Sequence, residues 1–197
     1  MTNLLWKQDP VVSAGRLQEL FGSPHEAVAQ KSVDRIDEHI RHFLSMSPLF
    51  FLSSSDGFGR CDTSPRGDEA GFVKPLDDRR IIYPERIGNR RIDSLLNMLQ
   101  NPQVGMLFMI PGMQEVLRLN GRVTLTENAE LIESMGWSGK SPSLAVVVEV
   151  EECFIHCPRA LKSSDIWNSG SWPSAEALPS PGEIFKAHLR MNGYEFK

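Results

Sequence analysis

The sequence predicts a small antiparallel β-barrel flanked by helices, and two observations predict it. Between about residue 50 and residue 151, apolar residues come in short runs of strand length that turn signals separate. Only a few segments show helical spacing, so most strands follow one another directly and can pair antiparallel. The 197 residues suffice for one domain with a sizeable core. We expect one domain, with N-terminal helices over 1–46, the barrel over 47–155, and a C-terminal tail and helix over 156–197.

Two helices are expected before the barrel. The segment from Arg16 to Phe21 is a short helix that Gly22 ends. Ser32 is expected to cap a longer helix, which Pro48 stops. The apolar stripe of that helix is formed by Val33, Ile36, Ile40, Phe43 and Leu44.

The barrel strands are defined by their apolar runs and by the turns between them. Asp56-Gly57 is typical of a hairpin turn after the first strand, and Pro111-Gly112 is a turn later in the chain. A short helix is expected from Asn128 to Met135, before the last strand. The expected strands cover 50–55, 60–66, 72–76, 80–83, 105–110, 115–125 and 144–151.

Three elements are expected after the barrel. Residues 156–167 form a short helix or turn, and residues 168–181 are rich in Ser, Gly and Pro, which is typical of a loop. Residues 182–191 form a last amphipathic helix.

The segment from Ile81 to Val104 is the most informative part of the chain. A short strand ends at Tyr83, Gly88 marks a turn, and Asn89 is a good N-cap for a helix that would start at Arg90. The buried stripe of that helix would be formed by Ile92, Leu95, Leu96 and Leu99, which lie at i, i+3, i+4 and i+7.

This helix start would place two cations, Arg90 and Arg91, in the first helical turn. Cations have the wrong charge for that end of the helix dipole, unless an anion binds between them and the free backbone N–H groups. A phosphate is the natural candidate for this anion. The alternative, a pair of solvated surface arginines, is about equally favoured by this segment alone.

The strand from Arg60 to Arg66 also carries an unusual set of polar groups. Alternation would send Arg60, Asp62 and Ser64 to one face of the strand. Such a face either meets solvent or lines a polar ligand, and taken alone the pattern favours solvent.

Composition excludes several classes of function. The net charge of −4 argues against general binding to nucleic acids or to a membrane surface. No apolar run reaches the roughly 18 residues that a membrane span needs. The N-terminal sequence MTNLLWKQDP has no apolar signal core, and three cysteines cannot all pair with one another. We therefore expect a cytoplasmic protein.

Other catalytic or metal sites are poorly supported. Cys153, His156 and Cys157 lie close together, but only Cys61 remains to complete a set of zinc ligands, so no metal is expected. We interpret His156 as structural. The sequence has no G-x-S-x-G elbow, no G-x-G-x-x-G after a strand and no P-loop, which disfavours serine hydrolases and Rossmann or Walker nucleotide sites.

Taken together, the segments resemble the pyridoxamine 5'-phosphate oxidase-like family of FMN-binding split β-barrels. The resemblance covers about residues 33–167. The tail HCPRALKSSDIW resembles the branch of the family that consists of probable FMN-dependent enzymes. The order and spacing of the matching segments are more specific to the family than any single segment is. The segments are GRCDTSPRG at 59–67, IIYPERIGNRR at 81–91, NPQVGMLF at 101–108, LRLNGRV at 117–123 and HCPRALKSSDIW at 156–167.

The resemblance implies an FMN site and a homodimer with two flavin sites at the interface. The phosphate would lie at Arg90 and Arg91, and the tail after the barrel would bring Lys162 or Trp167 to the partner's flavin. The alternative for Trp167 is a surface anchor under the loop. The other residues that the resemblance places at the flavin are Arg60, Asp62, Thr63, Ser64, Tyr83 and Pro84.

The chain also departs from the true oxidases. They carry a lysine where this chain has Pro65, and a flavin-contacting glutamine is replaced near Val116. Their C-terminal Arg-x-His type motif for the substrate has no counterpart. The resemblance therefore implies an FMN-dependent oxidoreductase with no catalytic side chain assigned and no support for pyridoxamine phosphate as substrate. The alternative is a non-catalytic flavin- or haem-binding module on the same scaffold.

Overall fold

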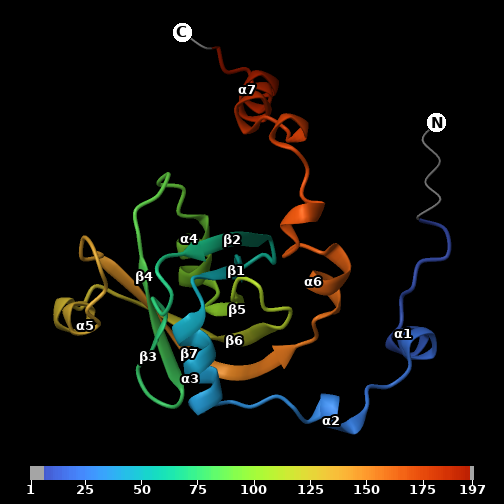
Figure 1. The fold of residues 1–197 in the computed structure, drawn as a ribbon, viewed down its shortest axis with the longest axis horizontal. Helices are drawn as coiled ribbons and strands as arrows, with labels where there is room; N and C mark the ends of the chain where they lie inside the picture. Colours follow the sequence, from blue (N-terminus) through green and yellow to red (C-terminus); the bar gives the residue numbers. More distant parts are fainter. Residues whose placement is uncertain (1–6, 196–197) are drawn as a thin grey trace.

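A seven-stranded antiparallel sheet forms the centre of the molecule, which confirms the predicted fold class. The computed structural model describes residues 7–195, and Figure 1 shows the sheet curling around its own inner face. The strand order is β2-β1-β5-β6-β7-β4-β3. The strands are β1 Leu49–Ser55, β2 Cys61–Gly67, β3 Lys74–Pro75, β4 Arg80–Glu85, β5 Gln103–Met109, β6 Val116–Thr126 and β7 Leu144–His156.

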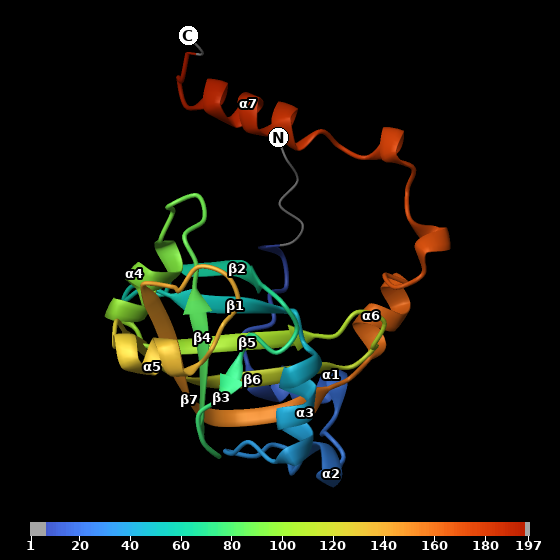
Figure 2. The ribbon, with the colours of Figure 1, turned by 60° about the vertical axis from the view of Figure 1, so that its left-hand side comes forward.

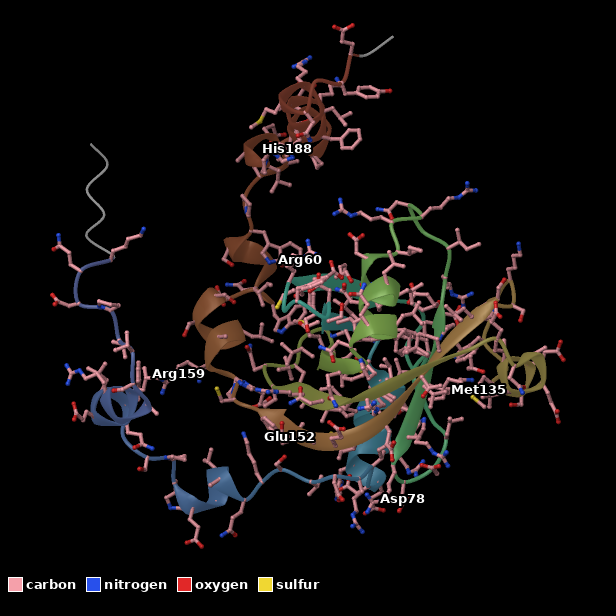
Figure 3. The ribbon with its side chains drawn as sticks, turned by 180° about the vertical axis from the view of Figure 1, so that it is seen from behind. Arg60, Asp78, Met135, Glu152, Arg159 and His188 are labelled. Carbon is pink, nitrogen blue, oxygen red and sulfur yellow. The ribbon has the colours of Figure 1, made fainter. Side chains whose placement is uncertain are left out.

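Helices flank the sheet, and two of them stand away from it. Neither α1 nor α7 buries a residue. Figure 1 shows both on extended arms outside the barrel, and in Figure 2 the arm that carries α7 again stands apart from the sheet. Figure 3 likewise places His188 of α7 far from Glu152 of β7. The helices are α1 Ala14–Phe21, α2 Glu26–Ala29, α3 Glu38–Met46, α4 Asp93–Gln100, α5 Ala129–Ser134, α6 Arg159–Ser164 and α7 Pro181–Met191, with short 3-10 turns at Ser169–Ser171 and Ala175–Ala177. None within residues 7–195 combines the length and apolar character needed to cross a membrane.

The core is centred on Phe50 of β1, which is fully buried. Its ring lies 5.0 Å from the rings of Tyr83 and Phe108 and 5.7 Å from the ring of Phe72. These residues come from β4, β5 and the segment before β3, so one aromatic cluster joins distant parts of the sheet. Aromatic contacts of this kind add to the free energy gained by apolar burial.

The two ends of the sheet approach each other without pairing as strands. At one end β2 pairs only with β1, and at the other end β3 is only two residues long and pairs with Ile81 and Ile82 of β4. The last residues of β4 therefore have a strand partner on one side only, β7. The side chain of Arg66 in β2 nevertheless reaches Glu85 in β4, with Nε 3.1 Å from Oε2. We call this gap between β2 and the end of β4 the seam.

The helix before the barrel begins later than expected. Ser32 does not cap it, because Val33 pairs with Cys153 of β7 through two backbone hydrogen bonds and so lies in extended chain. The side chain of Ser32 instead donates to Glu152. The cap is Asp37, whose carboxylate accepts from the backbone N–H of Ile40 at 2.8 Å.

The helix after the seam also begins later than expected. The prediction of a start at Arg90 is wrong, because Arg90 has a φ of +65° and α4 starts at Asp93. The register of the buried face changes with it, and Ser94 and Met98 are the buried residues of α4. The expected stripe is wrong for three of its four members: Ile92, Leu96 and Leu99 are 50%, 47% and 72% exposed.

Gly121 lies at an irregularity in the pairing of the two longest strands, β6 and β7. The pairing of β6 with β7 shifts between Asn120 and Gly121, which marks a β-bulge. A Cβ at position 121 would lie only 2.2 Å from the backbone oxygen of Glu149 in β7. Glycine is therefore the residue that this strand pair can accommodate here.

We expect Gly121→Ala to lower the free energy of unfolding by about 3 kcal/mol or more, because a backbone strand must move to relieve the overlap. Urea unfolding followed by circular dichroism measures this change. Gly88→Ala is the matched control, since a Cβ there meets nothing within 4 Å. Equal stability of the two variants would contradict the account of the bulge.

Candidate functional site

A pocket of about 900 Å³ opens at the seam. Its size is within the range of small-molecule sites in proteins. One wall is most of β2, from Asp62 onward, with Asp68 after it, and the opposite wall is the end of β4 with the following loop, from Pro84 to Ile92. Phe72, the first residues of α4, and Ser143 and Leu144 at the start of β7 complete the lining.

A chain of hydrogen bonds runs along the β2 wall. The hydroxyl of Ser94, in the first turn of α4, donates to the carboxylate of Asp62 at 2.6 Å. Ser94 and Ser64 are 3.1 Å apart between their hydroxyl oxygens, and Arg66 donates through Nη1 to Ser64 at 2.8 Å. Because Ser94 is buried, these bonds hold α4 and β2 in a fixed relation and leave the pocket with a polar wall.

The ion pair of Arg66 and Glu85 extends this chain across the seam. The two side chains are only 19% and 15% exposed, so water screens their attraction weakly. Tyr83 lies close by and is fully buried, and its hydroxyl finds no hydrogen-bond partner among the described residues. Burial raises the pKa of Tyr83, and the negative charge of Glu85 adds to that effect, so the phenol stays protonated.

Two arginines lie at the rim of the pocket, on the loop before α4. The side chain of Asn89 accepts from the backbone N–H of Arg91 at 2.9 Å, so it caps a local turn and not the helix. The guanidinium of Arg91 pairs with the carboxylate of Asp93, the first residue of α4. Arg90 has no ion pair among residues 7–195 and lines the pocket. The rim therefore offers one unpaired cation and a second whose partner an anion can replace.

The pocket brings together half of the residues predicted from the sequence. Five of them line it, namely Asp62, Ser64, Pro84, Arg90 and Arg91. Thr63 points to the other face of β2, where its hydroxyl lies 3.3 Å from that of Ser53. Tyr83 is in β4, but its side chain is buried in the core and does not line the pocket.

Alternation predicted that Arg60 shares a face with Asp62 and Ser64. The structure differs, because Arg60 precedes β2, in the hairpin turn, and does not line the pocket. Its Nε lies 2.7 Å from a carboxylate oxygen of Asp56. Backbone and side-chain hydrogen bonds from Arg60 and Phe58 lower the pKa of Asp56, whereas its partial burial opposes this shift. The role of this arginine in the structure is to hold the turn.

The tail residues lie away from the pocket of their own chain. Lys162 is in α6, and the indole N–H of Trp167 donates to the backbone oxygen of Met113 at 2.8 Å. Met113 belongs to the connection between β5 and β6. Trp167 thus anchors the tail to its own barrel.

Sequence reasoning missed the residues that bridge the seam. They are Arg66, Glu85, Arg86 and Asp68, and both of their ion pairs join β2 or the residue after it to β4 or the residue after it. The buried Ser94 was missed as well, because the helix register was misplaced. Within the described part of the chain, no three His, Cys, Asp or Glu side chains come close enough to hold a metal ion.

Comparison with known proteins gives one family and a set of similar folds. The family model described as Pyridoxamine 5'-phosphate oxidase matches residues 36–157. The crystal structure of HupZ from Group A Streptococcus is 18% identical, with a TM-score of 0.50, and covers 61% of this chain and 93% of that one. A putative pyridoxamine 5'-phosphate oxidase from Lactobacillus delbrueckii is 16% identical, with a TM-score of 0.49 and coverage of 62% and 95%. A search of curated proteins gave no match. At these identities, the likeness to HupZ supports the fold alone.

We expect Arg66→Ala to lower the free energy of unfolding by about 2 kcal/mol, because it leaves Glu85 without its partner in a half-buried site. Thermal or urea unfolding measures the loss. The matched control is Arg80→Ala, which removes the more exposed pair with Asp77 and should cost no more than about 1 kcal/mol. If the free energy of unfolding falls equally in both variants, the ion pair at the seam contributes no more to stability than the exposed pair does.

Proposed function

Because this chain belongs to the pyridoxamine 5'-phosphate oxidase family, we propose that it binds FMN in the seam pocket and acts as an FMN-dependent oxidoreductase. The observation that carries the proposal is the position of Arg90 and Arg91 at the rim of a pocket of about 900 Å³. A pocket of this size suits a three-ring cofactor, and the two cations suit the phosphate at its end.

The chemistry of the lining residues fits the parts of FMN. The phosphate would bind Arg90 and Arg91, with Asp93 giving up its pair with Arg91. The guanidinium of Arg66 offers a donor to the polar edge of the ring system, and the hydroxyl oxygen of Ser64, whose own hydrogen is used on Ser94, offers an acceptor. When bound, the flavin supplies the redox chemistry.

The protein's own residues would bind, orient and exclude water rather than transfer protons. Each carboxylate in the pocket already has a partner: Asp62 has Ser94, and the other three form ion pairs. The second candidate is a non-catalytic flavin-binding module. It is favoured by the carboxylates of the pocket, because each already has a partner and none is free to act as an acid or a base. A haem would need its iron ligand from elsewhere, because no histidine, cysteine, methionine or tyrosine lines this pocket.

Two measurements separate these candidates. The absorbance spectrum of the purified protein shows whether it carries a flavin, and the rate of NAD(P)H oxidation shows whether that flavin turns over. A flavin-loaded protein that is not reduced by NAD(P)H or other electron donors would favour the binding module. A protein that cannot be loaded with FMN would contradict the proposal.

We further propose a homodimer with the flavin sites at its interface. Three apolar side chains are exposed here, that of Ile92, which lines the pocket, and those of Leu96 and Leu99 on the following helix α4, and a partner surface can cover them. A second copy of the chain would cover them and enclose the flavin. The tail would then present Lys162 of α6, or the ring of Trp167, to the partner's flavin, while the indole N–H of Trp167 stays bonded to Met113 of its own barrel.

The arginine pair provides the sharpest test of the FMN site. We expect the double variant Arg90→Ala, Arg91→Ala to bind FMN at least about tenfold more weakly, since each charge-assisted bond to a phosphate contributes about 1.5–3 kcal/mol. Fluorescence titration measures the affinity. Asp93→Asn should change it in the opposite direction, because it frees Arg91 and removes a negative charge beside the phosphate. Unchanged affinity in the double variant would exclude these arginines from the site.

For the dimer, we expect sedimentation to give twice the chain mass of 22.1 kDa. In a crystal structure of the dimer, the interface should bury more than about 2,000 Å², the size typical of obligate dimers. Leu96→Asp and Leu99→Asp together should weaken the association, because they place charges in the proposed contact. A stable, flavin-loaded monomer is the result that would rule the dimer out.

A further inference from the structure

We propose that Arg86 is a positioning residue for the phosphate site: it fixes the loop that carries Arg90 and Arg91 and thereby sets the affinity for a phosphate-bearing ligand. This inference rests on the proposed FMN site. Arg86 follows β4 directly and lies four residues before Arg90. Arg86 lines the pocket, but the proposed effect does not require it to contact the phosphate.

The guanidinium of Arg86 binds two other segments with all three of its nitrogen atoms. Nε pairs with the carboxylate of Asp68, just after β2. Nη1 and Nη2 each donate at 3.0 Å to a backbone oxygen in the connection between α5 and β7, at Lys140 and Ser138. We call residues 86–92, which carry Arg90 and Arg91 between β4 and α4, the phosphate loop. Arg86 thus ties the start of the phosphate loop to both the β2 wall and the connection between α5 and β7.

The phosphate loop has few other restraints. The pairing of β4 with β7 ends at Glu85, and α4 begins at Asp93. Among the hydrogen bonds of residues 7–195, none joins residues 87–90 to another segment, and the bond from Arg91 to Asn89 is local. Ile87 is 81% exposed and contributes little packing. The position of the loop therefore depends on its ends, and Arg86 holds one of them.

The segment that receives Arg86 is itself held in place. The indole N–H of Trp137 donates to the backbone oxygen of Phe72 at 2.7 Å, and Lys74 donates to the backbone oxygen of Met135. These bonds attach residues 135–140 to the chain just before and within β3. Arg86 also lines the small pocket on this side, of about 130 Å³, so it forms a wall between that pocket and the larger one. The anchor is therefore built into the barrel.

The test compares FMN with riboflavin, which has the same ring system but no phosphate. In Arg86→Ala we expect the affinity for FMN to fall about tenfold and the affinity for riboflavin to change less than twofold, because only the phosphate contacts depend on the loop. Arg86→Lys restores the charge opposite Asp68 but cannot make both carbonyl bonds, so it should recover part of the loss. The matched control, Arg80→Ala, removes an arginine paired with Asp77 outside the pocket and should change neither affinity.

A purely structural role would lower both affinities together and would overturn the proposal, as would unchanged FMN binding. If Arg86→Ala does not fold, Asp68→Asn provides the test, because it removes the charge and keeps a hydrogen-bond acceptor; a selective loss of FMN affinity of about threefold is then expected.

A second readout needs no flavin. Amide hydrogen exchange of residues 87–91 should become faster in Arg86→Ala and stay unchanged in Arg80→Ala. If the wild-type chain binds neither flavin, the proposed function fails, and this exchange still decides the role of Arg86: faster exchange supports the positioning role, and unchanged exchange overturns it.

Discussion

The fold depends on one constraint: the sheet curls into a barrel, yet its two ends do not close through backbone hydrogen bonds. The inner face buries the aromatic cluster around Phe50, which draws the ends together. The strand edges of β2 and β4 then meet side chain to side chain, at the pair of Arg66 with Glu85 and the pair of Arg86 with Asp68. The same gap that the backbone leaves open provides the pocket, so the fold and the site arise from one feature.

Most strands could be predicted because their signals are local. Period-two burial in β1 and β5, and turn residues such as Asp56-Gly57, belong to neighbouring positions in the chain. Helix starts were harder, since in both cases the residue that is a good cap in the sequence is not the residue that caps the helix. Asn89 does cap a backbone N–H, but the left-handed conformation of Arg90 delays α4 to Asp93. Similarly, the pairing of Val33 with β7 overrides the cap that Ser32 offers.

The charge of the rim was visible in the sequence, and the family resemblance supplied three wall residues, Asp62, Ser64 and Pro84, but not the ion pairs that cross the seam. Arg90 and Arg91 are adjacent, so their unusual charge was visible in the sequence even though the expected helix start was wrong. Arg66 and Glu85 stand on different strands, and nothing in the spacing of the sequence indicates that these strands meet. Ser94 lies between Asp93 and Leu95 in the sequence, and only the true register of α4 turns it toward Asp62. Contacts between sheet ends need the three-dimensional closure before they can be recognised.

The order of the strands also bears on how the chain folds. Hairpins such as β1–β2 and β5–β6 can form from neighbouring residues, whereas β1 must also find β5, and β4 must find β7, across long stretches of chain. Such distant pairings cost loop entropy and set the folding rate of β-rich domains. The side chains at the gap meet only when both ends of the sheet are in place, so we expect closure of the barrel to come late in folding. The seam is joined by side chains alone, so we also expect it to open at a lower free-energy cost than the paired strands.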